Sequence, residues 1–109
     1  MVRVGMASAS DWDEVVGLAV AVRRSKLGLT QLVLAQAAGI HRNYLADVER
    51  GQKSPTMGVV YALCVALDCS PEKLVKQAVG YLTDEEKRRE AVEALPPRRP
   101  GRPKRAAAG

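Results

Sequence analysis

The side chains whose types could support catalysis, metal binding or specific recognition lie in two short stretches. His41, Arg42 and Asn43 stand side by side at the start of a predicted short helix, and Cys64 and Cys69 follow in a C-x4-C arrangement. The one histidine lies far along the chain from both cysteines, so no zinc set can form, and the cysteines are expected to be small core hydrophobes in a reducing compartment. No nucleophile–base set, carboxylate pair or phosphate-cradling glycine loop has a workable spacing. We therefore expect no enzyme, no metal site, no cofactor and no small-molecule substrate.

The charge of the chain indicates a polyanionic partner. Of 109 residues, 17 are basic and 12 acidic, which gives a net charge of +5. Residues 16–79 and 96–109 carry the excess of cations, whereas residues 1–15 and 80–95 are acidic. A basic body followed by a basic tail is typical of proteins that bind nucleic acid.

Length and composition are those of one soluble globular domain. Apolar residues make up 47% of the chain and charged residues 27%, while aromatic residues make up 4% with no Phe. This favours a core of Leu, Val, Ile and Ala between packed helices. No apolar run is long enough to span a membrane and no signal peptide is visible, so we expect a cytoplasmic, nucleoid-associated protein.

Hydrophobic periodicity predicts an all-α protein with five helices in succession. Their expected ranges are about 11–26, 31–38, 41–50, 57–67 and 71–79. The expected N-caps are Ser10 or Asp11, Thr30, Thr56 and Ser70, and the expected stops are Gly28, Gly39 and Gly51.

Beyond Gly80 the helical pattern weakens. Residues 83–95 are expected to form one more helix, opened by a capping box of Thr83 and Glu86, but its thin apolar stripe needs the body or a second subunit as a neighbour. The Pro- and Arg-rich end is expected to be disordered. The expected division is a flexible arm (1–10), a DNA-binding body (11–80), an accessory and candidate dimerisation helix (81–95) and a disordered basic tail (96–109).

The second and third predicted helices form a pair with a specific geometry. Gly39 in the turn between them is free to take positive φ, and Ala35 is small enough for the two helices to touch. Ile40, Leu45 and Val48 would anchor the second member of the pair to the body. Two helices about a short glycine turn, with the second polar on its free face, form the arrangement that places a helix in the major groove of DNA.

A linked set of residues carries a family resemblance. The positions are Arg24, Thr30-Gln31, Leu34-Ala35, Gly39-Ile40, Leu45 to Gly51 and Pro55-Thr56. With these residues, TQLVLAQAAGIHRNYLADVERGQKSPT resembles the Cro/lambda-repressor-type helix-turn-helix family, also called the xenobiotic-response-element family. The resemblance covers about residues 16–79. It implies a five-helix lambda-repressor-like domain and a sequence-specific regulator of transcription, most simply a repressor.

The resemblance also implies roles for individual residues. The base-reading face of the third helix would consist of Arg42, Asn43, Ala46 and Asp47, with Arg42 suited to guanine, Asn43 to adenine and Asp47 to cytosine N4. The phosphate contacts would come from Gln31, His41, Tyr44, Arg50 and Lys53. Arg24 and Glu49 would form a structural ion pair between the first and third helices.

Three residues depart from the family pattern. Leu32 and Val33 stand where charged, exposed residues are usual, and they would pack against the N-terminal arm around Trp12 or face a partner. Arg23 occupies a site that is often apolar, which leaves the register of the first helix open by one residue.

The C-terminal stretch RRPGRPKR is similar to an AT-hook. Gly101, Arg102 and Pro103 match its core, whereas Pro100 stands where an arginine is usual. Two interpretations stay open: insertion into the minor groove of A·T-rich DNA, or a nonspecific tail that raises affinity through counterion release. The contacting residues would be Arg99, Arg102, Lys104 and Arg105.

A single short helix reads few base pairs, so a homodimer on two half-sites of double-stranded DNA is expected. Residues 83–95, together with the turn before the fourth helix, are the candidate dimer element. Two variants with the same fold stay open. One is an antitoxin whose acidic helix and basic tail cover a toxin protein, and the other is a restriction–modification controller, which HRNYLADVERG also resembles.

Overall fold

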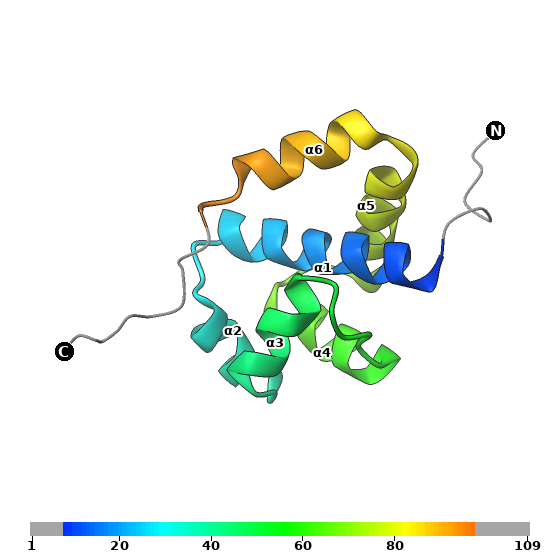
Figure 1. Ribbon diagram of the computed structural model, residues 1–109. Coiled ribbons are helices and arrows are strands. Elements are labelled where there is room, and N and C mark those ends of the chain that lie inside the picture. Colours follow the sequence, from blue (N-terminus) through cyan, green and yellow to red (C-terminus); the bar gives the residue numbers. More distant parts are fainter. Residues whose placement is uncertain (1–7, 98–109) are drawn as a thin grey trace.

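The computed structural model describes residues 8–97, which form six α-helices and no strand (Figure 1). The helices are α1 (Ala9–Lys26), α2 (Gln31–Ala38), α3 (Arg42–Glu49), α4 (Met57–Ala66), α5 (Pro71–Thr83) and α6 (Glu85–Ala94). The predicted all-α fold of five helices and a further C-terminal helix is confirmed. Residues 1–7 and the AT-hook-like stretch lie outside the described range. No helix within that range is long and apolar enough to cross a membrane.

The central element is α1. Seven consecutive residues, from Val15 to Ala21, are buried. A helix that is buried all round must have neighbours on every side, and α1 packs against α3, α5 and α6. Figure 1 shows α6 on one side of α1 and the group α2, α3 and α4 on the other. The remaining helices are therefore positioned by their contacts with α1 and with one another.

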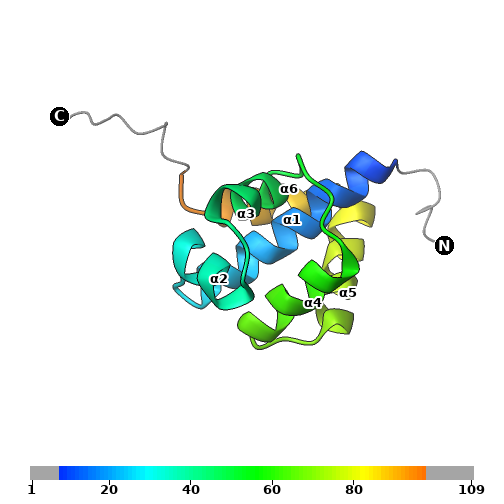
Figure 2. The same ribbon diagram turned by 90° about the horizontal axis from the view of Figure 1, so that it is seen from below.

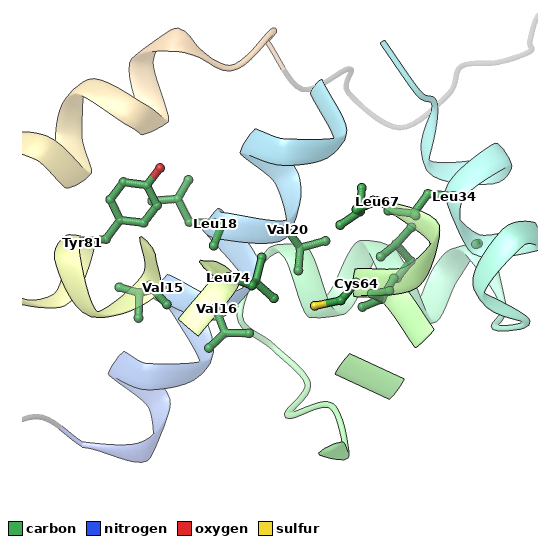
Figure 3. Packing of buried hydrophobic residues seen from close by; sticks show 14 residues of the cluster. Val15, Val16, Leu18, Val20, Leu34, Cys64, Leu67, Leu74 and Tyr81 are labelled. Carbon is green, nitrogen blue, oxygen red and sulfur yellow. The ribbon is translucent and has the colours of Figure 1, made fainter. Parts of the chain in front are cut away.

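Buried aliphatic side chains from α1, α2, α3, α4 and α5 form one core. Figure 3 shows Tyr81 near Leu18 at one end of it, with Leu34 and Leu67 beyond Val20 at the other. Except for Tyr81, which is 5% exposed, the buried side chains of this core are aliphatic or cysteine. Each fully buried Leu or Val contributes about 1.5–3 kcal/mol through removal of apolar surface from water.

Side-chain caps begin the helices. The hydroxyls of Thr30, Thr56 and Ser70 each accept a backbone N–H from the residue three positions on, at 3.1 Å, as the sequence predicts. However, α1 begins earlier than predicted, because Ser8 rather than Ser10 forms a capping box with Asp11. The hydrogen bonds from the backbone and hydroxyl of Ser8 lower the pKa of the Asp11 carboxyl. Residues 8–10 thus belong to α1 and its cap, not to a flexible arm.

The boundary between the last two helices also differs from the prediction. The N-cap of α6 is Asp84, whose carboxylate accepts the N–H of Lys87 at 3.1 Å. The Thr83 hydroxyl instead donates to the carbonyl of Val79 at 3.1 Å, within α5. The expected capping box of Thr83 and Glu86 is therefore wrong, and the last helix begins at residue 85 rather than 83. A carboxylate is the better cap here because its charge also meets the positive end of the helix dipole.

The helix α6 lies against its own chain. Ala91 and Leu95 pack on the core, and Arg88 forms an ion pair with Glu14 of α1. Of the two neighbours that the sequence left open for this helix, the structure provides the body of the same protein.

Arg23 has a structural partner that the sequence did not indicate. Its Nε donates to the carbonyl of Leu67 and its Nη2 to the carbonyl of Asp68, both at 3.0 Å. Carbonyls at the end of a helix have no N–H partner in the next turn, so the guanidinium supplies it. Arg23 of α1 therefore caps the C-terminal end of α4.

The two cysteines meet across the end of α4. Asp68 takes a left-handed conformation with φ of 54°, and the Cys69 N–H donates to the carbonyl of Cys64 at 3.0 Å, as in a Schellman turn. Both thiols are free, and Cys64 is 1% exposed. Burial, followed by the neighbouring Cys69 thiol, raises the pKa of Cys64 to about 11.

We predict that alkaline pH destabilises the protein through Cys64. Its pKa rises from an ordinary 9.0 to about 11, so above pH 9.0 the unfolded chain loses a proton that the folded protein keeps. Deprotonation then favours unfolding, and the free energy of unfolding falls as pH rises towards 11. Urea unfolding at about pH 8 and about pH 10 measures the fall. The fall in the free energy of unfolding between the two pH values should be smaller in Cys64→Ala than in the parent. An equal fall in the parent and the variant contradicts the prediction.

Candidate nucleic-acid interface

The turn between α2 and α3 has the geometry that its sequence predicts. Gly39 ends α2 in the left-handed region with φ of 74°, and the Ile40 N–H donates to the carbonyl of Ala35 at 3.0 Å. A Cβ added to Gly39 would touch nothing within 4 Å, so glycine is required for its backbone angle alone. Ala35 is 1% exposed, which lets the helix pair pack closely.

The helix α3 has one buried face and an exposed beginning. Leu45 and Val48 are fully buried, whereas Arg42 and Asn43 are exposed in the first turn. Arg42 Nη1 lies 3.4 Å from Asn43 Oδ1, so the two polar side chains lie side by side. Figure 2, seen from below, shows α2, α3 and α4 on the near side of α1.

His41 is the N-cap of α3. Its Nδ1 accepts the backbone N–H of Asn43 at 3.1 Å, which requires that this nitrogen carry no proton. Sequence reasoning placed His41 near phosphates and missed the cap, because histidine is not among the preferred N-cap residues. The available signal was its position, immediately before a helix that begins with no Ser, Thr or Asp.

A hydrogen-bonded cluster around Glu49 holds the far end of α3. Arg24 Nε donates to Glu49 Oε2 at 2.7 Å, and its Nη2 donates to Oε1 at 2.9 Å. Gln31 Nε2 also donates to Oε1 at 2.9 Å, while Arg24 Nη1 donates to the carbonyl of Leu29 at 2.9 Å. The expected pairing of Arg24 with Glu49 is present in this cluster, and it joins α1, the start of α2 and the end of α3.

A glycine on α1 lets α3 approach directly. A Cβ added to Gly17 would lie 2.1 Å from the carbonyl oxygen of Val48 and 2.9 Å from that of Glu49. At such distances no side chain fits, so the backbones of α1 and α3 are in contact. Sequence reasoning missed this contact, although a lone glycine inside an apolar helical run is a signal of close packing.

Polar residues at the end of α3 pair locally. Asp47 forms an ion pair with Arg50 of the following turn, and Lys53 Nζ lies 4.0 Å from its carboxylate. These two cations therefore offset the negative charge of Asp47. Arg50 and Lys53 are themselves exposed.

Comparisons with known proteins agree with this geometry. A helix-turn-helix family profile matches residues 21–74. The uncharacterized HTH-type transcriptional regulator y4dJ of Sinorhizobium fredii is 37% identical over 65 residues, which are 60% of this chain and 84% of that protein. The chain belongs to the Cro/lambda-repressor-type helix-turn-helix family.

Two further proteins resemble this helix-turn-helix chain. The control protein C.SmaI of Serratia marcescens is 34% identical over 65 residues, covering 60% of this chain and 77% of that protein. The crystal structure of the clp gene regulator ClgR from Corynebacterium glutamicum has a TM-score of 0.68 and 26% identity. The match covers 75% of this chain and 87% of the ClgR chain.

The positions assigned from the sequence to DNA contact differ in their exposure. Tyr44, Ala46 and Asp47 are half-buried, and the Gln31 side chain points to Glu49. The predicted tail contacts lie outside residues 8–97; they are Arg99, Arg102, Lys104 and Arg105.

Two apolar residues of α2 face solvent. Leu32 is 50% exposed and Val33 is 47% exposed. Of the two alternatives left open for them, packing on Trp12 does not occur, because Trp12 lies beside α4 and α5. Within the described residues, no group of three or more His, Cys, Asp or Glu side chains is placed to hold a metal ion.

We predict that Glu49→Gln destabilises the fold by about 3 kcal/mol, because it leaves the Arg24 guanidinium without its carboxylate. The side chain of Glu49 is 3% exposed and that of Arg24 is 19% exposed, so little water compensates. Urea unfolding measures the change, with Glu90→Gln on the exposed face of α6 as the matched control. Replacing both Arg24 and Glu49 by Met should recover much of the loss. If Glu49→Gln is as stable as the parent, the cluster does not hold α3.

Proposed function

We propose that this protein binds specific sequences of double-stranded DNA and regulates transcription, with α3 as the recognition helix. The observation that carries the proposal is the division of α3 into an exposed polar first turn and a buried, hydrogen-bonded far end. Arg42 and Asn43 are exposed, whereas Val48 is fully buried and Glu49 accepts three hydrogen bonds from two side chains. A rigid helix that projects its first turn is what readout of the major groove requires.

The base-reading residues are proposed from the free face of α3. Arg42 donates two hydrogen bonds to a guanine edge, and Asn43 forms hydrogen bonds with an adenine edge. Ala46 offers a small apolar contact. Asp47 accepts from cytosine N4. The pairing of Asp47 with Arg50 supports its place on this face, because it lowers the repulsion between a carboxylate and nearby phosphates.

Phosphate contacts are proposed around this face. The N-terminus of a helix attracts anions, so Gln31 at the start of α2 is expected to bind a phosphate with its backbone N–H and with the side-chain amide hydrogen that does not bond Glu49. Arg50 and Lys53 add exposed positive charge just after α3. His41 and Tyr44 flank the first turn and complete the expected set.

A homodimer is proposed because α3 is only eight residues long. One such helix contacts few base pairs, and a two-fold symmetric pair doubles the sequence that is read. A dimer that covers an operator excludes other proteins from it, so repression is its simplest action.

We predict that Arg42→Ala and Asn43→Ala each weaken binding to the preferred site by about 10- to 100-fold, because each removes a bidentate contact with a base. Selection from a random DNA pool identifies the site, and gel-shift titration measures affinity. Arg42→Lys keeps the charge but loses the paired donors, so it should relax specificity at one base pair. Lys53→Ala should instead weaken binding to all sequences and lower the salt slope by about one.

Lys76→Ala is the matched control, since Lys76 is an exposed cation on α5, away from the α2–α3 pair. Its effect should stay within about twofold. If both Arg42→Ala and Asn43→Ala bind the selected site as tightly as the parent does, α3 is not the recognition helix.

A restriction–modification controller is a second candidate function. The similarity to the control protein C.SmaI, over 77% of that protein, favours it. A controller of this kind is expected to bind the DNA upstream of methylase and restriction genes. Footprinting on the DNA that flanks this gene tests the candidate, and protection confined to promoters of unrelated genes contradicts it.

A further inference from the structure

The turn that ends α4 has a cysteine at its first and at its last position. Beyond the cap residue Leu67, the chain reverses through Asp68, whose φ of 54° is left-handed. The Asp68 N–H donates to the carbonyl of Val65 at 3.2 Å. The Cys69 N–H donates to the carbonyl of Cys64 at 3.0 Å. These are the two hydrogen bonds of a complete Schellman motif.

A Schellman motif normally brings the side chains at its two ends into apolar contact. In this protein both of those side chains carry a thiol. Cys64 is 1% exposed and lies among the buried side chains of the core (Figure 3), and the half-buried Cys69 packs against the same core. Burial, followed by the Cys69 thiol, raises the pKa of Cys64, so the two sulfurs are neighbours.

The backbone of this turn meets the distance requirement of a disulfide. Disulfides join residues whose Cα atoms lie about 4.4–6.8 Å apart. The hydrogen bond of 3.0 Å between the Cys69 nitrogen and the Cys64 oxygen, with the bond lengths on either side, limits the Cα–Cα separation to about 7 Å. The turn therefore holds the two cysteines within reach of each other without any unfolding of α4.

We propose that Cys64 and Cys69 form a reversible disulfide site, which a low-molecular-weight disulfide such as glutathione disulfide oxidises. In a reducing compartment the pair stays as two free thiols, as in this structure. When the surrounding thiol pool becomes oxidised, the bond closes. Cys69 directly precedes Ser70, the N-cap of α5. The disulfide thus ties the last turn of α4 to the start of α5.

The half-buried Cys69 is the thiol that reacts with the oxidant. Its thiolate attacks one sulfur of the external disulfide, breaks that S–S bond and releases one external thiol. In the mixed disulfide, the Cys64 sulfur then attacks the Cys69 sulfur, and the proton of the Cys64 thiol passes to the departing thiolate. Two protein thiols and one external disulfide thus give one protein disulfide and two external thiols.

Cys64 is not suited to the first step. It is 1% exposed, so an external disulfide does not reach its sulfur. Its pKa of about 11 also keeps the thiol protonated at neutral pH, whereas the thiolate is the nucleophile. In the second step the Cys69 sulfur is already beside it, so no access from solvent is needed.

A metal site is a weaker interpretation of the same pair. Zinc that is bound by thiolates takes four ligands. Within residues 8–97, no group of three or more His, Cys, Asp or Glu side chains could hold a metal ion, so the two thiols have no further ligands beside them. Two core thiols without any redox role are the remaining alternative. They differ from a disulfide site in one measurable property, the equilibrium of disulfide formation in the folded protein.

Redox titration of the parent chain with glutathione and glutathione disulfide tests the proposal, in native buffer and in about 8 M urea. Peptide mapping quantifies the Cys64–Cys69 disulfide at each ratio. Because the folded turn already holds the sulfurs together, the effective concentration of one thiol at the other should be about tenfold or more higher in native buffer than in urea. An equal or lower value in native buffer overturns the proposal. The titration uses only the parent, so it does not depend on a variant that folds.

Two single variants test the order of the steps. With glutathione disulfide, Cys64→Ala should accumulate the glutathione adduct of Cys69, because the second thiol is missing. Cys69→Ala should stay unmodified, because its remaining thiol is buried. Circular dichroism melting checks that each variant is folded. An adduct on Cys64 of folded Cys69→Ala, or no adduct on Cys69 of folded Cys64→Ala, overturns the proposed order.

Discussion

The carboxylate of Glu49 is the contact on which the arrangement of the first three helices depends. It accepts two hydrogen bonds from Arg24 and one from Gln31, so a single side chain of α3 ties α1 and α2 to it. The remaining Arg24 donor holds the carbonyl of Leu29 in the turn before α2. A planar guanidinium serves a carboxylate and a carbonyl at once, which a lysine ammonium with its point charge does less well. The cluster therefore positions the start of α2 and the far end of α3.

Local signals in the sequence were sufficient for most of the fold. Helical spacing and hydroxyl caps predict α2, α4 and α5, and Gly39 predicts the turn, because caps and turns depend on residues that are close in sequence. The start of α1 at Ala9 and the cap at Asp84 were missed because more than one residue near each helix start can serve as the cap: Ser8 or Ser10 in the first case, and Thr83 or Asp84 in the second. Gly17 was missed for a different reason. Its neighbour is the backbone of residues 48 and 49, and a glycine within an apolar helix indicates close packing without identifying the partner.

The candidate site was predictable in outline but not in its pairings. The spacing of apolar residues identifies the free face of α3, and Arg42 and Asn43 are exposed on it. The hydrogen bond of Gln31 with Glu49 joins residues 18 positions apart, and the ion pair of Asp47 with Arg50 depends on side-chain rotamers. Neither pairing can be predicted from the local sequence. The exposed side of α4 could not be predicted from the sequence either. Its sequence is apolar throughout, and only the fold shows which side remains open to solvent.

The glycine at position 17 makes the formation of α1 conditional on its neighbour. A glycine inside a helix costs about 1 kcal/mol relative to alanine, so α1 as an isolated segment is a poor helix. That cost is offset only once the last turn of α3 lies against it, since the same missing side chain permits the contact. Folding of α1 and docking of α3 are therefore one cooperative event. A partly folded chain with a well-formed α1 and a loose α3 is correspondingly disfavoured, which keeps the polar first turn of α3 in a single orientation.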